Sequence, residues 1–160
     1  CDIPNTISST MLALKDLKIN YLTVHISSGY KALKDLKKVS GKTKIVGVTT
    51  LTSLDNKDLK SIGYNKTLRE IVISQSKLAK KAKLDAIVCS PLEVKFVREI
   101  FDKEIITPGI RISSKLDDQK RVMTPKAAFN QGSDWLVIGR SLTKGNVRKN
   151  FKILSDHLNK

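Results

Sequence analysis

The sequence predicts an α/β protein with a parallel β-sheet, and three observations support this class. An initial helical segment is followed by five alternations of a short strand and a helix. The strands are apolar along their whole length instead of alternating, which is typical of parallel strands covered on both faces. Polar residues that could contact a ligand follow the carboxyl ends of the strands, where α/β proteins build ligand sites.

The first half of the chain switches repeatedly between helical spacing and short β-branched runs. Gly29 ends the first strand, and a polar turn through Asp55 follows the second. The expected elements of this half are a helix beginning near Pro4, the strand 21–26, the helix 30–39, the strand 44–51 and the helix 67–83.

The second half continues the alternation, and its helix boundaries carry the clearest signals. Pro91 fits the first turn of one helix. Thr124, Pro125 and Gly132 fit the N-cap, the first helical position and the position just past the end of another. Trp135 is assigned to the core. The expected elements are the strand 85–90, the helix 91–101, the strand 104–108, the polar loop 109–123, the helix 124–132, the strand 134–140 and the helix 146–158.

Length and composition favour one globular domain over residues 1–160. The chain is 40% hydrophobic and 28% charged, which argues against wholesale disorder, and its apolar runs are too short to cross a bilayer. Cys1 and Cys89 make neither a disulfide framework nor a zinc site, so a reduced cytoplasmic setting is expected and Cys89 is expected to be buried. A chain that starts with Cys1 instead of Met predicts a piece of a longer protein.

The formal net charge of +15 raises nucleic acid as a partner. The lysines, however, alternate with apolar residues in the helical segments 30–38 and 76–83, so solvated helix faces are the favoured explanation. Aromatic residues make up 5% of the chain and are not interleaved with basic ones as a stacking platform requires. Nucleic-acid binding therefore stays the less favoured alternative.

Polar residues at strand ends are the candidate site residues, and each also has a structural explanation. His25 can be a hydrogen-bonded residue at a strand end, threonines in 49–52 favour strands, and Ser90 can cap the next helix. Arg140 differs, because it follows Gly139 at a strand end, where backbone N–H groups and a guanidinium favour phosphate. The candidates are His25, 49–53, Ser90, Arg111 and Arg140.

Seven segments resemble the orotidine 5′-phosphate decarboxylase family in order and approximate spacing: "DIPNT", "TVHISSG", "VTTLTS", "VCSPLE", "TPGIR", "DDQKRVMTP" and "VIGRSLT". They span essentially the whole chain. The resemblance implies a (β/α)8 TIM barrel, of which this chain covers about strands 4 to 8 as a single partial domain. It also implies a homodimer that converts orotidine 5′-monophosphate to uridine 5′-monophosphate (UMP) and CO2 without a cofactor or metal.

The same resemblance implies residue roles. Asp2 would be the last acid of the family's Asp-x-Lys-x-x-Asp motif, whose lysine falls upstream of Cys1, and Asp2 and Thr6 would reach the partner subunit's site. In "HISSG" the family more often has a glycine in place of Ser28. The implied substrate contacts are Thr52 near the ribose, Ser90 at the pyrimidine, Arg111, Gly139 and Arg140 at the phosphate, and Gln119 on a loop, 108–122, that closes over the phosphate, with His25 as a further candidate.

The implied chemistry is electrostatic. Loss of CO2 leaves an electron pair on C6 of the pyrimidine without a conjugated sink, so an ammonium flanked by carboxylates has to stabilise and then protonate the carbanion. This chain lacks the lysine, and five strands cannot close an eight-stranded barrel, so the isolated chain is expected to be inactive. A related barrel lyase acting on a sugar phosphate is the alternative enzyme, although "DDQKRV" and "VTTLTS" favour the nucleotide.

Overall fold

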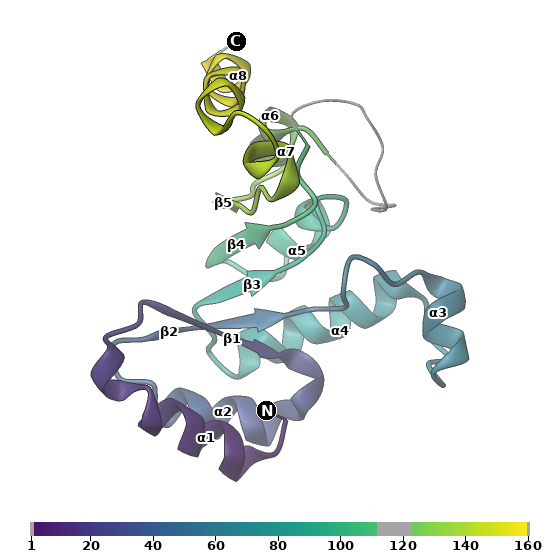
Figure 1. The fold of residues 1–160 in the computed structure, drawn as a ribbon. Helices are drawn as coiled ribbons and strands as arrows, with labels where there is room; N and C mark the ends of the chain where they lie inside the picture. Colours follow the sequence, from purple (N-terminus) through teal and green to yellow (C-terminus); the bar gives the residue numbers. More distant parts are fainter. Residues whose placement is uncertain (1, 112–122, 160) are drawn as a thin grey trace.

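A five-stranded parallel sheet forms the centre of the chain in the computed structural model, which describes residues 2–111 and 123–159 (Figure 1). The strands lie in the order β1-β2-β3-β4-β5, and every neighbouring pair is parallel. Successive strands are added on the same side, so the sheet winds in one direction, unlike a doubly wound sheet. The predicted α/β class is confirmed. The strands are β1 (Tyr21–His25), β2 (Lys44–Val48), β3 (Ala86–Val88), β4 (Glu104–Thr107) and β5 (Trp135–Leu136).

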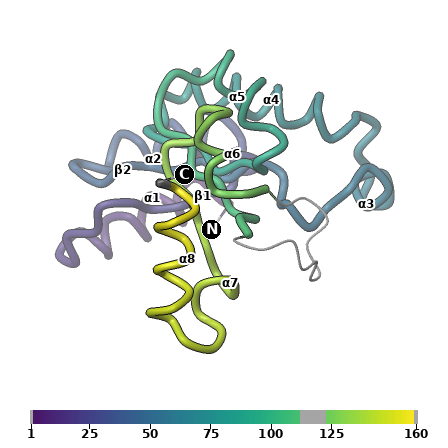
Figure 2. The backbone as a smooth tube through the Cα atoms, turned by 90° about the horizontal axis from the view of Figure 1, so that it is seen from above, coloured from purple at the N-terminus to yellow at the C-terminus, as the bar shows by residue number. Residues whose placement is uncertain are grey.

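Helices connect the strands, and two short 3-10 turns flank β1. In Figure 1, α4 and α5 lie behind the sheet, while Figure 2 shows α1 and α3 at opposite sides of the molecule. None of the helices in the described ranges is long and apolar enough to cross a membrane. The elements are α1 (Pro4–Ala13), η1 (Lys15–Leu17), η2 (Ile26–Ser28), α2 (Gly29–Val39), α3 (Asn56–Ser61), α4 (Leu68–Lys81), α5 (Val94–Arg98), α6 (Pro125–Asn130), α7 (Arg140–Thr143) and α8 (Val147–Asn159).

The main core lies between the sheet and the helices α1, α2, α4 and α5. Ile45, Ile87 and Ile105 sit on one face of β2, β3 and β4 and are fully buried in this core. Gly47 faces the same core, where an added Cβ would come within 2.7 Å of a Leu84 methyl carbon. Glycine at this position therefore lets the helix layer approach the strand closely.

Helix caps explain several boundaries. Thr124 accepts the Ala127 N–H at the start of α6, as the sequence predicted. Thr67 and Glu70 form a capping box that begins α4, at the start of the helix expected at 67–83. A second capping box, between Asp55 and Asp58, begins α3. A helix here was not predicted from the polar turn through Asp55, although acids three positions apart are a capping signal.

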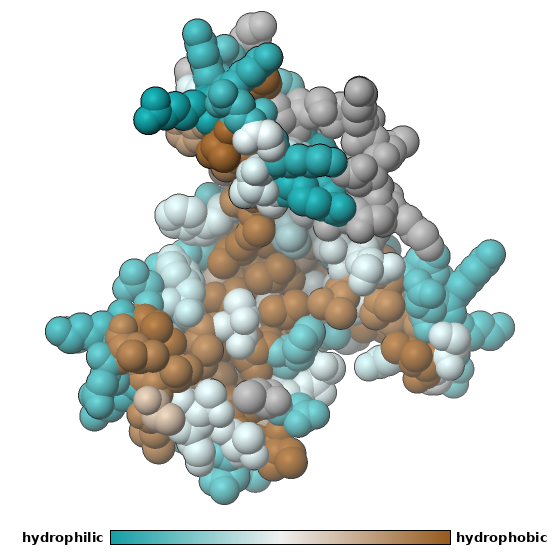
Figure 3. All heavy atoms as spheres, viewed as in Figure 1, coloured by the Kyte–Doolittle hydropathy of each residue, from teal (hydrophilic) through white to brown (hydrophobic). Residues whose placement is uncertain are grey.

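The face of the sheet turned away from the main core differs from two predictions. Trp135 is 54% exposed instead of belonging to the core, and β1 exposes Tyr21, Thr23 and His25, so the two edge strands are not covered on both faces. The helices of the main core cover the opposite face, where Val24 of β1 is buried. Figure 3 shows apolar side chains across the middle of this view, over the strands, with polar side chains gathered over α3, α7 and α8.

All five strands are shorter than predicted, and the helix expected at 91–101 covers only Val94–Arg98, so Pro91 precedes it. The strand expected at 85–90 keeps only Ala86–Val88. The strand expected at 44–51 ends at Val48, and the strand expected at 134–140 keeps only Trp135–Leu136. Arg140 consequently begins the short helix α7 instead of ending a strand. Apolar residues alone did not reveal where pairing with the neighbouring strand stops.

Candidate functional site at the carboxyl end of the sheet

The loops after β2, β3 and β5 all leave the sheet at its carboxyl end, where the parallel strands finish. Each loop begins with a backbone hydrogen bond that continues the pairing of the parallel strands. These N–H groups and carbonyls are Thr49 to Val88 at 3.1 Å, Cys89 to Ile106 at 3.2 Å and Val137 to Thr107 at 2.9 Å. The polar residues that follow these strands are therefore held at one end of the sheet.

Arg111 is the residue at the carboxyl end of the sheet that points most directly to a bound anion. Its backbone N–H donates to the Met123 carbonyl at 3.0 Å, and the Met123 N–H donates to the Gly109 carbonyl at 3.3 Å, so the two ends of the segment 112–122 are held together. The Nη2 atom of Arg111 is buried and has no hydrogen-bond partner among the described residues. Such a buried cationic donor is costly unless an anionic acceptor satisfies it.

Gly139 and Arg140 follow β5, the strand that pairs with β4, so Arg111 and Arg140 extend from adjacent strands. Gly139 and Arg140 are both exposed. Two guanidinium groups on neighbouring strand ends can serve one phosphate. Gln119 and most of the predicted loop 108–122 lie outside the described residues.

The loop after β2 is fixed by a residue that the sequence analysis missed. Gln75 of α4 accepts the backbone N–H of Thr50 at 2.9 Å and its hydroxyl at 3.2 Å, while the Thr49 hydroxyl donates to the Val88 carbonyl at 2.9 Å. Thr52 lies two residues farther along and is partly exposed. A glutamine within a helical pattern carries no sequence signal for this contact.

His25 lines a cavity of ≈150 Å³ at the same edge, together with Thr50 and Gln75. Its carbonyl accepts the Ser28 hydroxyl at 2.7 Å. Ser28 has ordinary helical dihedrals, with φ −64°, so the serine in "HISSG" fits this turn and no glycine is required there.

Ser90 and Cys89 are buried after β3. The Ser90 N–H donates to the Glu93 carboxylate at 2.9 Å, and its hydroxyl accepts the Leu92 N–H at 3.4 Å, so Ser90 caps the turn before α5. Cys89 is 1% exposed, and burial raises the pKa of its thiol. The expected burial of Cys89 is confirmed, and its protonated thiol is a poor nucleophile.

Asp2 and Thr6 lie apart from the two arginines within this chain. They belong to the segment around the start of α1, which packs against α2 beside β1, at the opposite side of the sheet from β5. Both residues are exposed. Their side chains are therefore accessible to another polypeptide.

Comparison with known proteins gives one consistent family. Residues 1–150 match the family described as "Orotidine 5'-phosphate decarboxylase / HUMPS family". The chain is 48% identical over 153 residues to orotidine 5′-phosphate decarboxylase of Wolbachia sp. subsp. Brugia malayi, covering 93% of this chain and 68% of that protein. It is 45% identical to the protein of that name from Ehrlichia chaffeensis, covering 89% of this chain and 64% of that one.

Solved structures agree with the fold. The crystal structure of orotidine 5′-phosphate decarboxylase from Lactobacillus acidophilus superimposes with a TM-score of 0.83 at 32% identity, covering 99% of this chain and 71% of that chain. The five parallel strands thus match part of a barrel enzyme structure. The chain spans about two thirds of the length of the curated relatives that it matches.

Proposed function

This chain belongs to the orotidine 5′-phosphate decarboxylase / HUMPS family, and we propose that it forms the phosphate-binding part of an enzyme that converts orotidine 5′-monophosphate to UMP and CO2. The observation that carries the proposal is the Nη2 atom of Arg111 at the base of a loop, which is buried and has no hydrogen-bond partner among residues 2–111 and 123–159. A phosphate oxygen is the acceptor that fits it. The proposal places the chain at about strands 4 to 8 of a (β/α)8 barrel, with residues 1–160 as one partial domain.

The proposed phosphate site consists of Arg111, Gly139 and Arg140, with Gln119 on the loop that covers it. It is supported by the position of both arginines after the paired strands β4 and β5, because barrel enzymes commonly bind phosphate after their last strands. Phosphate binding far from the reacting carbon supplies energy for ordering the site.

The remaining contacts are proposed at the same edge of the sheet. Thr52 lies near the ribose on the loop that Gln75 holds through Thr50, and His25 lines the adjacent cavity. Ser90 is placed near the pyrimidine because it follows β3 directly. Since its hydroxyl already caps a turn, mutation of Ser90 is expected to affect folding as well as binding.

The proposed reaction uses no cofactor. The bond between C6 and the carboxylate breaks, its electron pair stays on C6, CO2 leaves, and the ammonium of a lysine upstream of Cys1 donates a proton to C6. Asp2 flanks that lysine and fixes its position. Asp2 and Thr6 also reach the site of a partner subunit in a homodimer, a role that their exposure supports.

The sugar-phosphate lyase alternative shares the fold and the family description. The relatives with 42 to 50% identity carry the name orotidine 5′-phosphate decarboxylase, which supports the nucleotide substrate. Nucleic-acid binding does not account for the strand-end residues.

The test is to join residues 1–160 to the amino-terminal segment of the Wolbachia relative that this chain does not match, giving what we call the joined enzyme. We expect the joined enzyme to form UMP from orotidine 5′-monophosphate and the isolated chain to form none. Turnover of a pentulose phosphate by a folded joined enzyme, without UMP formation, would favour the alternative. UMP formation by the isolated chain would show that the upstream lysine is dispensable.

A further inference from the structure

The amino end of the sheet carries a concentration of lysines that the proposed reaction does not use. Two cavities of ≈250 and ≈280 Å³ lie on either side of the turn between α4 and β3 and share Lys83. We name their lysines the amino-end lysine patch. Its members are Lys34, Lys37, Lys38, Lys80, Lys81, Lys83 and Lys103.

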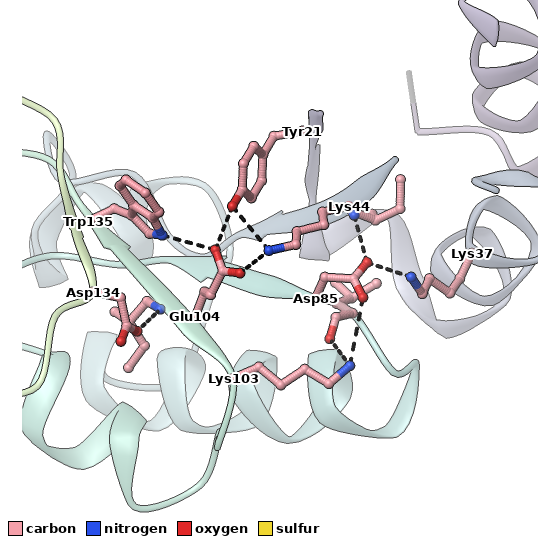
Figure 4. Close-up of polar contacts among 11 residues, drawn as sticks. Tyr21, Lys37, Lys44, Asp85, Lys103, Glu104, Asp134 and Trp135 are labelled. Atoms are coloured by element: carbon pink, nitrogen blue, oxygen red, sulfur yellow. Dashed lines mark hydrogen bonds and ion pairs between the residues drawn. The ribbon is translucent and has the colours of Figure 1, made fainter. Parts of the chain in front are cut away.

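The patch keeps an excess of positive charge. Asp85 pairs with Lys37 at 2.5 Å and with Lys103 at 3.8 Å, as Figure 4 shows. Asp35 and Asp102 pair with one further patch lysine each. Three carboxylates thus face seven ammonium groups, and Lys34, Lys81 and Lys83 have no ion pair within the described part of the chain.

Favourable interactions with the helix dipoles explain only part of this clustering of lysines. Lysines in the last turns of α2 and α4 offset the negative ends of the helix dipoles. Lys83 lies beyond α4, in the left-handed region with φ +59°, where glycine is normally preferred. Lys83 lines both cavities, so its ammonium group is available to an anion in either one.

The residues around the patch indicate which class of anion it can bind. The ring of Tyr30 already lies under two ammonium groups, with Lys81 Nζ at 4.8 Å and Lys34 Nζ at 5.7 Å from its centroid, so it offers no free platform for a base. Lysine ammonium groups contact phosphates as point charges without reading bases. Two adjacent hollows suit successive phosphates of one extended strand.

We propose that the amino-end lysine patch binds single-stranded nucleic acid through its phosphates, without base preference, at the opposite end of the sheet from the decarboxylase site. This inference does not rest on the proposed reaction. It assigns a use to part of the net charge of +15 that the phosphate site leaves unexplained.

The test measures fluorescence anisotropy of a labelled oligouridylate with the 160-residue chain at several salt concentrations. The triple variant Lys34→Gln, Lys81→Gln, Lys83→Gln should weaken binding at least about tenfold near 0.1 M salt and reduce the salt slope by about 2. The matched control removes three exposed lysines outside the patch, Lys126, Lys149 and Lys152, and should weaken binding by less than about threefold. Equal losses in the two triples, or tighter binding of polyglutamate than of the oligouridylate, would overturn the proposal.

A second pair of variants separates ligand binding from turn structure. Lys18 also has positive φ, at 49°, and lies outside the patch. Lys83→Gly and Lys18→Gly should both raise the unfolding temperature, because glycine relieves the left-handed conformation. Only Lys83→Gly should weaken oligouridylate binding; unchanged binding in that variant would contradict the assignment of Lys83.

Discussion

The two ends of the sheet differ in how their charged side chains are paired. At the amino end, Glu104 accepts hydrogen bonds from Tyr21 at 2.8 Å and Trp135 at 3.0 Å and pairs with Lys44, so one carboxylate links four strands (Figure 4). At the carboxyl end, Arg111 keeps a buried nitrogen without a partner in the described ranges.

A second contact type repeats at the amino end. Asp85, just before β3, accepts the Ile45 N–H of β2 at 2.8 Å, and Asp134, just before β5, accepts the Ile105 N–H of β4 at 2.7 Å. These acids cap backbone groups at the start of the sheet. These acids thus stabilise the sheet itself, whereas the carboxyl end includes a buried group that needs a ligand, as expected where a barrel enzyme builds its active site.

The largest expected effect belongs to the carboxyl end. In the joined enzyme, Arg140→Ala should lower kcat/KM for orotidine 5′-monophosphate by about 100-fold or more, equivalent to about 3 kcal/mol, because a charge-assisted phosphate contact is lost. Its unfolding temperature should change little, since Arg140 is exposed. Steady-state kinetics and thermal unfolding check both parts; near-normal kcat/KM would remove Arg140 from the phosphate site.

An intermediate effect is expected at the amino end. Glu104→Gln should lower the free energy of unfolding of the 160-residue chain by about 1 to 2 kcal/mol, because Lys44 loses its charged partner and the links across the sheet weaken. Urea unfolding measures this. The matched control is Asp102→Asn, whose side chain is 75% exposed and 4.0 Å from Lys80, and which should cost less than about 0.5 kcal/mol. Equal effects of the two changes would remove the distinction.

The pH dependence of the free energy of unfolding tests the stabilising role of these carboxylates further. Burial by itself would raise the pKa of Glu104, but hydrogen bonds from Lys44, Tyr21 and Trp135 outweigh it and lower the pKa. Hydrogen bonds from Lys31 and Lys38 lower the pKa of Asp35 to about 2.

Folded pKa values below the unfolded ones mean that these carboxylates contribute stability above the usual carboxyl range. This contribution is lost as the pH falls through the folded values. We therefore expect the free energy of unfolding to decrease from about pH 5 toward pH 2, with a shallower decrease in Glu104→Gln. An unchanged slope in that variant would show that Glu104 does not contribute to acid sensitivity.

The smallest expected effect concerns Cys89. Because its thiol is buried and its pKa is raised, a thiol reagent should not modify it in the folded chain at pH 8 and should modify it in urea. A Cys1→Ser background isolates the signal. Rapid modification without denaturant would mean that the end of β3 opens.

The sequence predicted the order of elements well because periodicity and caps are local properties. Thr67 and Thr124 mark helix starts through contacts with residues three positions away. Strand ends such as Val48 and Leu136 were predicted less well, since they depend on the register with a neighbouring strand, which is not a local property. Trp135 was misassigned because an apolar side chain does not reveal which face of its strand the core helices cover.

The candidate site was predictable as a set of strand ends but not as a set of contacts. The positions of Arg111 and Arg140 follow from the alternation of strands and helices. Ser90 forms a local cap with Glu93, three positions away, which is one of the two explanations that the sequence offered for this serine. The contact of Gln75 with Thr50 depends on the packing of α4 behind the sheet, and it leaves no spacing in the sequence by which to find it.

The most direct test compares Arg111→Ala with Glu104→Gln in the joined enzyme, measuring kcat/KM for orotidine 5′-monophosphate and the unfolding temperature of each. We expect Arg111→Ala to lose at least about 100-fold in kcat/KM without lowering the unfolding temperature, because the change removes a costly buried donor. Glu104→Gln should lower the unfolding temperature and keep kcat/KM within about threefold. The reverse pattern, with catalysis sensitive to Glu104 and stability sensitive to Arg111, would contradict the assignment of ligand binding to the carboxyl end.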